Sequence, residues 1–121
     1  MEADPVSRKT IMVVDGNRES RASTADLLEL NGYPVMQAES GTSALDLLKL
    51  GAPAPALILA GLSAADGRSF LQRVRRRHWL AGVPIVLIST EDNPQVDGVK
   101  EILKKPVAAN TLLNCVARQA V

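Results

Sequence analysis

The sequence contains one cysteine and very few aromatic residues, and each shortage excludes a class of structure. Because only 2% of the 121 residues are Phe, Trp or Tyr, the core has to be built from aliphatic side chains. Cys115 has no second cysteine to pair with, so an internal disulfide is excluded and a reducing, cytoplasmic location is expected. No histidine or basic residue adjoins Cys115, which favours a buried apolar side chain over a reactive thiol.

The sequence also lacks an excess of charge of one sign and a long apolar run. The net charge is +1, which gives no general attraction to nucleic acid or to an anionic membrane. No run approaches the ~18 apolar residues of a membrane span. The basic run from Arg73 to His78 has no interleaved aromatic residues and is expected to be a solvated helix end. We therefore expect no nucleic-acid or membrane partner for this domain.

The composition indicates one globular domain, with 46% hydrophobic and 22% charged residues. Residues 1–9 are polar and contain Pro5, so we expect them to form a flexible N-terminal tail. Residues 10–121 are expected to form the domain itself.

Short apolar runs alternate with segments of helical periodicity over the rest of the chain. The runs predict strands at residues 11–14, 35–38, 57–60, 85–88 and 99–103. Helices are predicted over residues 18–31, from residue 41 to Gly51, from Asp66 to about residue 78, and from Ala108 onward. The segment between the last two strands is broken by Pro94 and Gly98 and can hold one or two helical turns at best.

This alternation predicts an α/β fold, a three-layer (βα)5 domain with a parallel five-stranded sheet. Right-handed crossovers with helices on both faces favour the strand order 2-1-3-4-5. In such a sheet, functional groups lie just past the carboxyl ends of the strands. The residues at those ends are Asp15, Gly61, Ser89 and Lys105.

The motifs in this order resemble the receiver domain of bacterial two-component response regulators, over nearly the whole chain. I-M-V-V-D-G-N-R resembles the first strand and acidic loop of that family, and P-A-L-I-L-A-G its third strand. V-P-I-V-L-I-S-T resembles the fourth strand, and K-E-I-L-K-K-P-V the Lys-Pro signature after the fifth. The resemblance implies the CheY-like, flavodoxin-like version of the fold.

The resemblance also implies a phosphorylation site. In the family, an aspartate after strand three accepts a phosphoryl group from a histidine kinase or phosphotransfer protein. Acids after strand one hold Mg²⁺, and a Ser or Thr after strand four and the Lys before the Pro bind the phosphoryl oxygens. The residues that match this pocket are Asp15, Ser89, Thr90, Lys105 and Pro106.

Two positions depart from the family pattern. Gly16 stands where a second metal-binding acid is usual, and Gly61 stands where the phosphoacceptor is expected. No Asp or Glu occurs at residues 47–65, and Asp66 is better explained as the N-cap of the third helix. With Asp15 as the single acid, Mg²⁺ binding is expected to be weak or absent, and no other cofactor is expected. Lys105 is then expected to bond Asp15 or a backbone carbonyl.

The region between Ser89 and Lys105 is also several residues shorter than in the family. Helix four of the family is therefore expected to be short or missing, and Ile102 stands where an aromatic residue is common. The hypothesis that follows is a degenerate receiver, or pseudo-receiver. It is not an enzyme, and it acts in two-component (phosphorelay) signalling through phosphorylation-independent protein contacts. The expected partners are a histidine kinase, a phosphotransfer protein or a fused output domain, and a homodimer would be unsurprising.

Two alternatives stay open from the sequence. One is anion or small-ligand sensing by Lys105, Ser89 and backbone N–H groups near Gly61. The other is a receiver that is phosphorylated at a non-standard carboxylate. An enzyme on the same scaffold is disfavoured, because the sequence shows no phosphate-binding Gly-rich loop and no Ser-His-Asp set.

Overall fold

The computed structural model describes residues 9–120, in which strands and helices alternate along the chain. The elements are β1 (Ile11–Asp15), α1 (Arg18–Leu30), β2 (Val35–Ala38), α2 (Gly41–Leu47), β3 (Leu57–Gly61), α3 (Ala64–Arg75), the short 3₁₀ helix η2 (His78–Leu80), β4 (Ile85–Ser89), β5 (Glu101–Lys104) and α4 (Ala109–Gln119). The predicted tail, residues 1–9, lies outside the described residues except for Lys9. Within the described part of the chain, no helix is long and apolar enough to cross a membrane.

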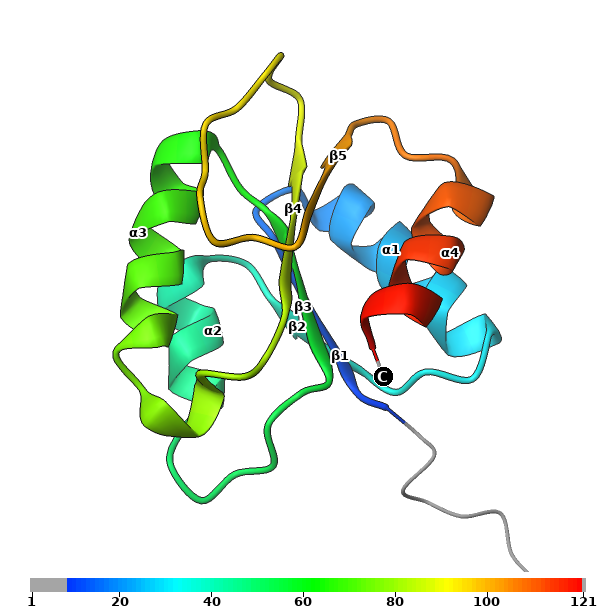
Figure 1. Cartoon of the computed structure of the whole chain (residues 1–121). Coiled ribbons are helices and arrows are strands. Elements are labelled where there is room, and N and C mark those ends of the chain that lie inside the picture. Colours follow the sequence, from blue (N-terminus) through cyan, green and yellow to red (C-terminus); the bar gives the residue numbers. More distant parts are fainter. Residues whose placement is uncertain (1–8, 121) are drawn as a thin grey trace, which may run out of the picture.

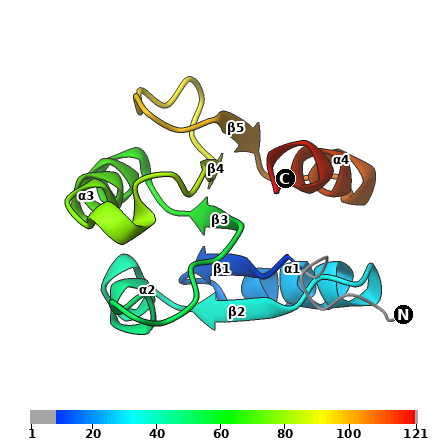
Figure 2. The same ribbon diagram turned by 60° about the horizontal axis from the view of Figure 1, so that its bottom comes forward.

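The five strands form one parallel sheet in the order β2-β1-β3-β4-β5, which confirms the predicted fold. Figures 1 and 2 show α2 and α3 on one face of the sheet and α1 and α4 on the other. The register places Asp15 of β1 opposite Gly61 of β3, and Ser89 of β4 opposite Lys104 of β5. The ends of these strands therefore meet at one edge of the sheet.

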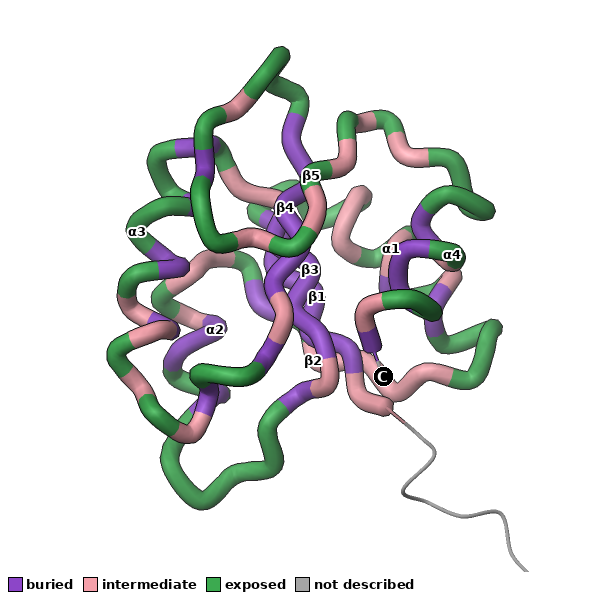
Figure 3. Tube along the Cα trace, in the orientation of Figure 1, coloured by how far each residue is buried: buried purple, intermediate pink, exposed green. Residues whose placement is uncertain are grey.

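The core consists of two apolar layers that the central strands separate. Side chains alternate between the faces of a strand, so Met12 and Ile58 pack with α2 and α3, whereas Val13 and Leu59 pack with α1 and α4. Figure 3 shows the central strands as an almost continuous buried region. Cys115 belongs to the second layer and has no exposed surface, as predicted for an apolar role.

The connection between β4 and β5, the β4–β5 loop (residues 90–100), contains no helix. Instead it lies along α3, on the same face of the sheet (Figure 1). Val96 is buried in the layer that contains Leu71 of α3, and the Arg68 guanidinium donates to the Gln95 carbonyl at 2.7 Å. Gly98 has a φ of +92° and adjoins Leu71, where a Cβ would come within 2.9 Å of the Leu71 Cδ2. The predicted short or missing helix between these two strands is thus absent from the described residues, and a loop packed on α3 takes its place in the chain.

Several predicted boundaries were wrong. α3 ends at Arg75 rather than near residue 78, and His78 begins the separate helix η2. Asp66 is not the N-cap of α3: Ser63 is, because its hydroxyl accepts the Asp66 N–H at 3.1 Å and the helix begins at Ala64. α2 ends at Leu47 rather than near Gly51. There the carbonyl of Leu48 accepts the indole N–H of Trp79 at 3.0 Å, a tertiary contact at the helix end. β5 begins two residues later than predicted, at Glu101.

Candidate functional site at the carboxyl edge of the sheet

Four predicted residues come together at the carboxyl edge of the sheet, in what we term the crevice (Asp15, Gly61, Ser89 and Lys105). Asp15, Gly61 and Ser89 are the last residues of β1, β3 and β4. Lys105 follows β5, and its backbone N–H donates to the Ser89 carbonyl at 2.8 Å, which extends the strand pairing by one residue. The other predicted residues lie beside the crevice: Thr90 and Pro106 line a cavity with Asp15 and Lys105, and Gly16 follows Asp15 at the surface.

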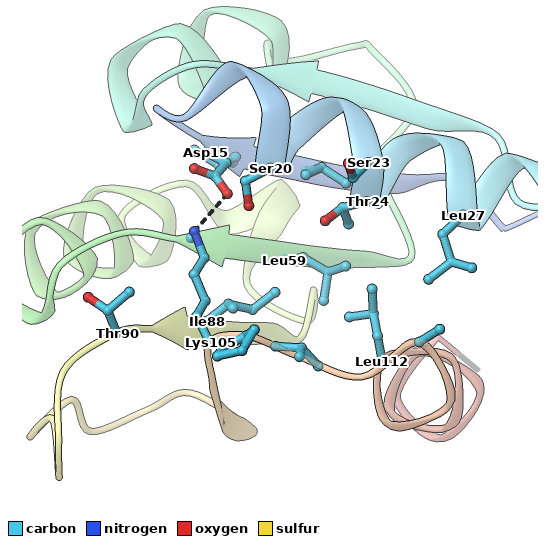
Figure 4. A pocket seen from close by; sticks show the side chains of 16 residues that line it. Asp15, Ser20, Ser23, Thr24, Leu27, Leu59, Ile88, Thr90, Lys105 and Leu112 are labelled. Atoms are coloured by element: carbon cyan, nitrogen blue, oxygen red, sulfur yellow. Dashed lines mark hydrogen bonds and ion pairs between the residues drawn. The ribbon is translucent and has the colours of Figure 1, made fainter.

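An ion pair joins the two charged residues of the crevice. The Lys105 Nζ lies 3.0 Å from the Asp15 Oδ2, so Lys105 takes the carboxylate partner that was one of its two predicted roles (Figure 4). The side chains are 24% and 8% exposed, respectively. The Asp15 Oδ1 accepts the Asn17 N–H at 2.9 Å, and the Arg21 guanidinium donates to the Asp15 backbone carbonyl at 2.7 Å. Both carboxylate oxygens of Asp15 therefore have partners.

The Asp15 carboxylate lies in the volume that a side chain at residue 61 would need. A Cβ built on Gly61 would lie 2.9 Å from the Asp15 Oδ2 and 3.0 Å from its Cγ, closer than real Cβ atoms come, so the Asp15 carboxylate would have to move. At Gly16 a Cβ would come no closer than 3.6 Å to another residue, the Glu39 carbonyl. The glycine at residue 61 is thus coupled to the position of Asp15, whereas the glycine at residue 16 is not.

These residues do not fit a Mg²⁺ ion. Mg²⁺ requires near-octahedral coordination by oxygen, with carboxylates among its usual protein ligands. Asp15 is engaged by Lys105, and Gly16 and Gly61 supply no side-chain oxygen. Among residues 9–120, no group of three His, Cys, Asp or Glu side chains is placed to hold a metal ion.

A second carboxylate reaches the crevice, that of Glu91 in the β4–β5 loop. The Glu91 Oε1 accepts the Ala64 N–H at 2.6 Å, at the first residue of α3. The buried Ser89 hydroxyl donates to the same oxygen at 3.3 Å and accepts the Glu91 N–H at 3.0 Å. The sequence analysis missed Glu91, because it stands in the polar run T-E-D-N, where nothing local distinguishes the acid whose carboxylate contacts Ala64 and Ser89.

A cavity of about 490 Å³ extends from the ion pair into the space between α1 and α4 (Figure 4). Its floor is apolar and includes Leu59 and Leu112, while Ser20 and Thr24 of α1 line one wall. Lys105 and Asp15 are its only charged lining residues among those described. The cavity is thus apolar at one end and carries an already neutralised charge pair at the other.

A further carboxylate ties the amino end of β5 to the last turn of α4, away from the crevice. The Glu101 Oε1 accepts from the Arg118 guanidinium at 2.7 Å, and its Oε2 accepts from the Gln119 amide at 2.6 Å. These hydrogen bonds, that from Arg118 foremost, hold the pKa of Glu101 below its ordinary value. Burial raises the pKa of the neighbouring Cys115 thiol to about 11, so this thiol is protonated at neutral pH and is no nucleophile.

Comparisons with known proteins agree with this geometry. Residues 11–117 match the family model described as the response regulator receiver domain. The two-component response regulator ORR6 of Oryza sativa subsp. japonica is 32% identical over 110 residues, which cover 84% of this chain and 65% of that protein. The CAI-1 autoinducer sensor kinase/phosphatase CqsS of Vibrio cholerae serotype O1 is 29% identical over 116 residues, which cover 90% of this chain and 17% of that protein. This chain therefore spans less than two thirds of either relative.

Solved structures show the same fold. The chemotaxis response regulator CheY4 of Vibrio cholerae superposes with a TM-score of 0.82 at 24% identity, over 94% of this chain and 99% of that one. A receiver domain (CheY-like) from Methylobacillus flagellatus superposes with a TM-score of 0.79 at 17% identity, over 92% of this chain and 98% of that one.

Proposed function

Because this chain belongs to the response regulator receiver domain family, we propose that it is a receiver whose output does not depend on phosphorylation of an aspartate after β3. Receiver domains are non-catalytic signalling modules of two-component systems, and this chain is one of them. What we propose is that this receiver transmits its signal without phosphorylation after β3.

The glycine at the end of β3 is the observation that carries this proposal. A phosphoacceptor has to supply a carboxylate nucleophile, and Gly61 has no side chain. No acid stands at residues 47–65 that could replace it, and Asp66 lies exposed in the first turn of α3. The space that an acceptor side chain would need holds the Asp15 carboxylate, which is paired with Lys105. These contacts support a receiver that keeps the fold of the family but cannot be phosphorylated after β3.

We propose that the module works through contacts with other proteins. Receiver domains interact with histidine kinases, and a kinase, a phosphotransfer protein or a fused output domain would be a partner of this kind. The β4–β5 loop and β5 offer part of such a surface, where the Ile102 side chain is 40% exposed. A homodimer and a cytoplasmic location stay predictions.

The alternative of anion sensing has less support, because its donors already have partners. The Lys105 ammonium contacts Asp15, and the Ser89 hydroxyl and the Ala64 N–H contact Glu91. An external anion would have to displace a carboxylate that is tethered to the same chain. We therefore favour a protein-contact module over an anion sensor.

The test is treatment with acetyl phosphate and Mg²⁺, or with beryllofluoride and Mg²⁺, read by intact mass and amide chemical shifts. A phosphorylatable receiver treated in parallel serves as the positive control. We expect no added phosphoryl mass and no shifts at Asp15, Gly61, Ser89 or Lys105. A stable phosphoryl adduct would overturn the proposal, and mapping it to Asp15 or Asp66 would establish the alternative of a non-standard acceptor.

A further inference from the structure

We propose that Glu91 is a built-in oxyanion, which fills the part of the crevice where a phosphoryl group would be bound and so holds the β4–β5 loop against α3 without phosphorylation. This inference rests on the proposed function. It assigns to the Glu91 carboxylate the contacts with Ala64 and Ser89 that would replace a phosphoryl group.

The contacts of Glu91 are those that a small oxyanion would make. Its Oε1 takes one hydrogen bond from the hydroxyl of Ser89, a residue that is 3% exposed, and one from the N–H of Ala64. A free N–H at the start of a helix and a buried hydroxyl both favour a negatively charged acceptor. Ser89, Gly61 and Lys105 line one small cavity together with Glu91, which is itself exposed, so Glu91 borders the crevice on its solvent side.

The neighbouring acid in the loop does not take this role. Asp92, which is exposed as Glu91 is, pairs with Lys104 of β5 and not with α3. Glu91 is thus the acid of the β4–β5 loop that reaches across to α3, and it does so at the residue where the loop leaves the buried strand.

The contact anchors the first part of a loop whose later residues are also attached to α3. Arg68 of α3 holds the Gln95 carbonyl, and Val96 is buried beside Leu71. The anchor at Glu91 fixes the loop where it crosses from β4 to α3. The contacts of Glu91 therefore link Ser89 at the end of β4 to the first residue of α3 without an external group.

The test compares Glu91→Gln and Glu91→Ala with the matched control Asp92→Asn, which removes one charge from the same loop. The readouts are amide hydrogen exchange at Ala64 and the chemical shifts of Ala64, Ser89 and Gln95. In Glu91→Ala, loss of a hydrogen bond to a charged acceptor should speed exchange at Ala64 by about tenfold or more. Asp92→Asn should leave Ala64 unchanged. Equal behaviour of the Glu91 variants and Asp92→Asn at Ala64 would overturn the proposal.

Titration with inorganic phosphate gives an independent readout that uses the wild-type chain as well. Millimolar phosphate should leave Ala64 and Ser89 unshifted in the wild-type protein and shift both, saturably, in Glu91→Ala. A wild-type response as strong as that of Glu91→Ala would overturn the proposal, and so would no response in a folded Glu91→Ala. If Glu91→Ala fails to fold, hydrogen exchange in Glu91→Gln and the phosphate titration of the wild-type protein still test whether Glu91 takes this role. Failure of the proposed function would instead appear as a phosphoryl adduct on the wild-type chain, whatever the behaviour of Ala64.

Discussion

At the scale of single residues, Gly61 and Asp15 share one volume, so the residue after β3 controls where the Asp15 carboxylate can lie. This arrangement is specific to residue 61. A Cβ there would lie 2.9 Å from the Asp15 Oδ2, whereas the nearest atom at residue 16 is 3.6 Å away. The two glycines stand at positions where the family has acids, but only Gly61 makes room for the Asp15 carboxylate.

We expect Gly61→Ala to lower the free energy of unfolding by about 1–3 kcal/mol, because the new methyl group forces the paired Asp15 carboxylate to move. Gly16→Ala is the matched control. It should be neutral or slightly stabilising, since alanine restricts the unfolded chain and meets no close atom. Urea denaturation of both variants measures the difference. Equal stability of the two would show that Asp15 moves aside without cost.

The ion pair of Lys105 supports a second prediction at this scale. Lys105→Met keeps an apolar stem but leaves the nearly buried Asp15 without its cation, so we expect a loss of about 1.5–3 kcal/mol in the free energy of unfolding. Lys104→Met is the control, because Lys104 pairs with Asp92 at an exposed site where ion pairs contribute little. Comparable losses in the two variants, measured by urea denaturation, would contradict a structural role for the Asp15–Lys105 pair.

At the scale of elements, Glu101 joins the edge strand β5 to α4. β5 is short and half-exposed and is paired on one side only, with β4, so its side-chain contacts to α4 matter for its position. The hydrogen bonds from Arg118 and Gln119 favour the ionised carboxylate, which is why the pKa of Glu101 is lowered from its ordinary value of 4.5.

A lowered carboxyl pKa sets the direction of the pH dependence. The contribution of Glu101 is fully present above its unfolded-state pKa and is lost as the pH falls through its folded-state pKa. We therefore expect wild type to be more stable than Glu101→Gln at neutral pH, and the difference to shrink in the range below pH 4.5. Denaturation curves of both proteins from pH 7 to acid test this. A difference that stays constant into acid would rule out the ionised carboxylate as its cause.

At the scale of the whole molecule, the altered crevice should make stability independent of divalent cations. A ligand that binds only the folded state raises the free energy of unfolding by RT ln(1 + [L]/Kd), about 2.7 kcal/mol at a hundredfold excess over Kd. Because Asp15 is committed to Lys105 and Gly16 and Gly61 supply no oxygen ligands, we expect Mg²⁺ to leave the unfolding midpoint unchanged relative to NaCl of equal ionic strength. A saturable increase in the midpoint would show a metal site.

Local patterns in the sequence were sufficient to predict the fold and the meeting of Asp15, Gly61, Ser89 and Lys105. The apolar runs of β1, β3 and β4 are strands buried on both faces, β2 and β5 are the partly exposed edge strands, and right-handed crossovers leave few strand orders for five such units. The four residues then meet because each follows a strand that ends at the same edge. The Ser63 cap also has a local signature, S-A-A-D, although the sequence analysis predicted Asp66 as the cap.

Only the tertiary structure decided which partner each polar group takes. Asp15 and Lys105 are 90 residues apart, and Glu91 meets Ala64 across 27 residues. Nothing near Glu91 in the chain separates it from Asp92, because the choice between them depends on how the β4–β5 loop lies on α3. Periodicity and turn chemistry act between neighbours in sequence and so can be predicted from it. The pairing of charges depends on distances that only the packed core establishes.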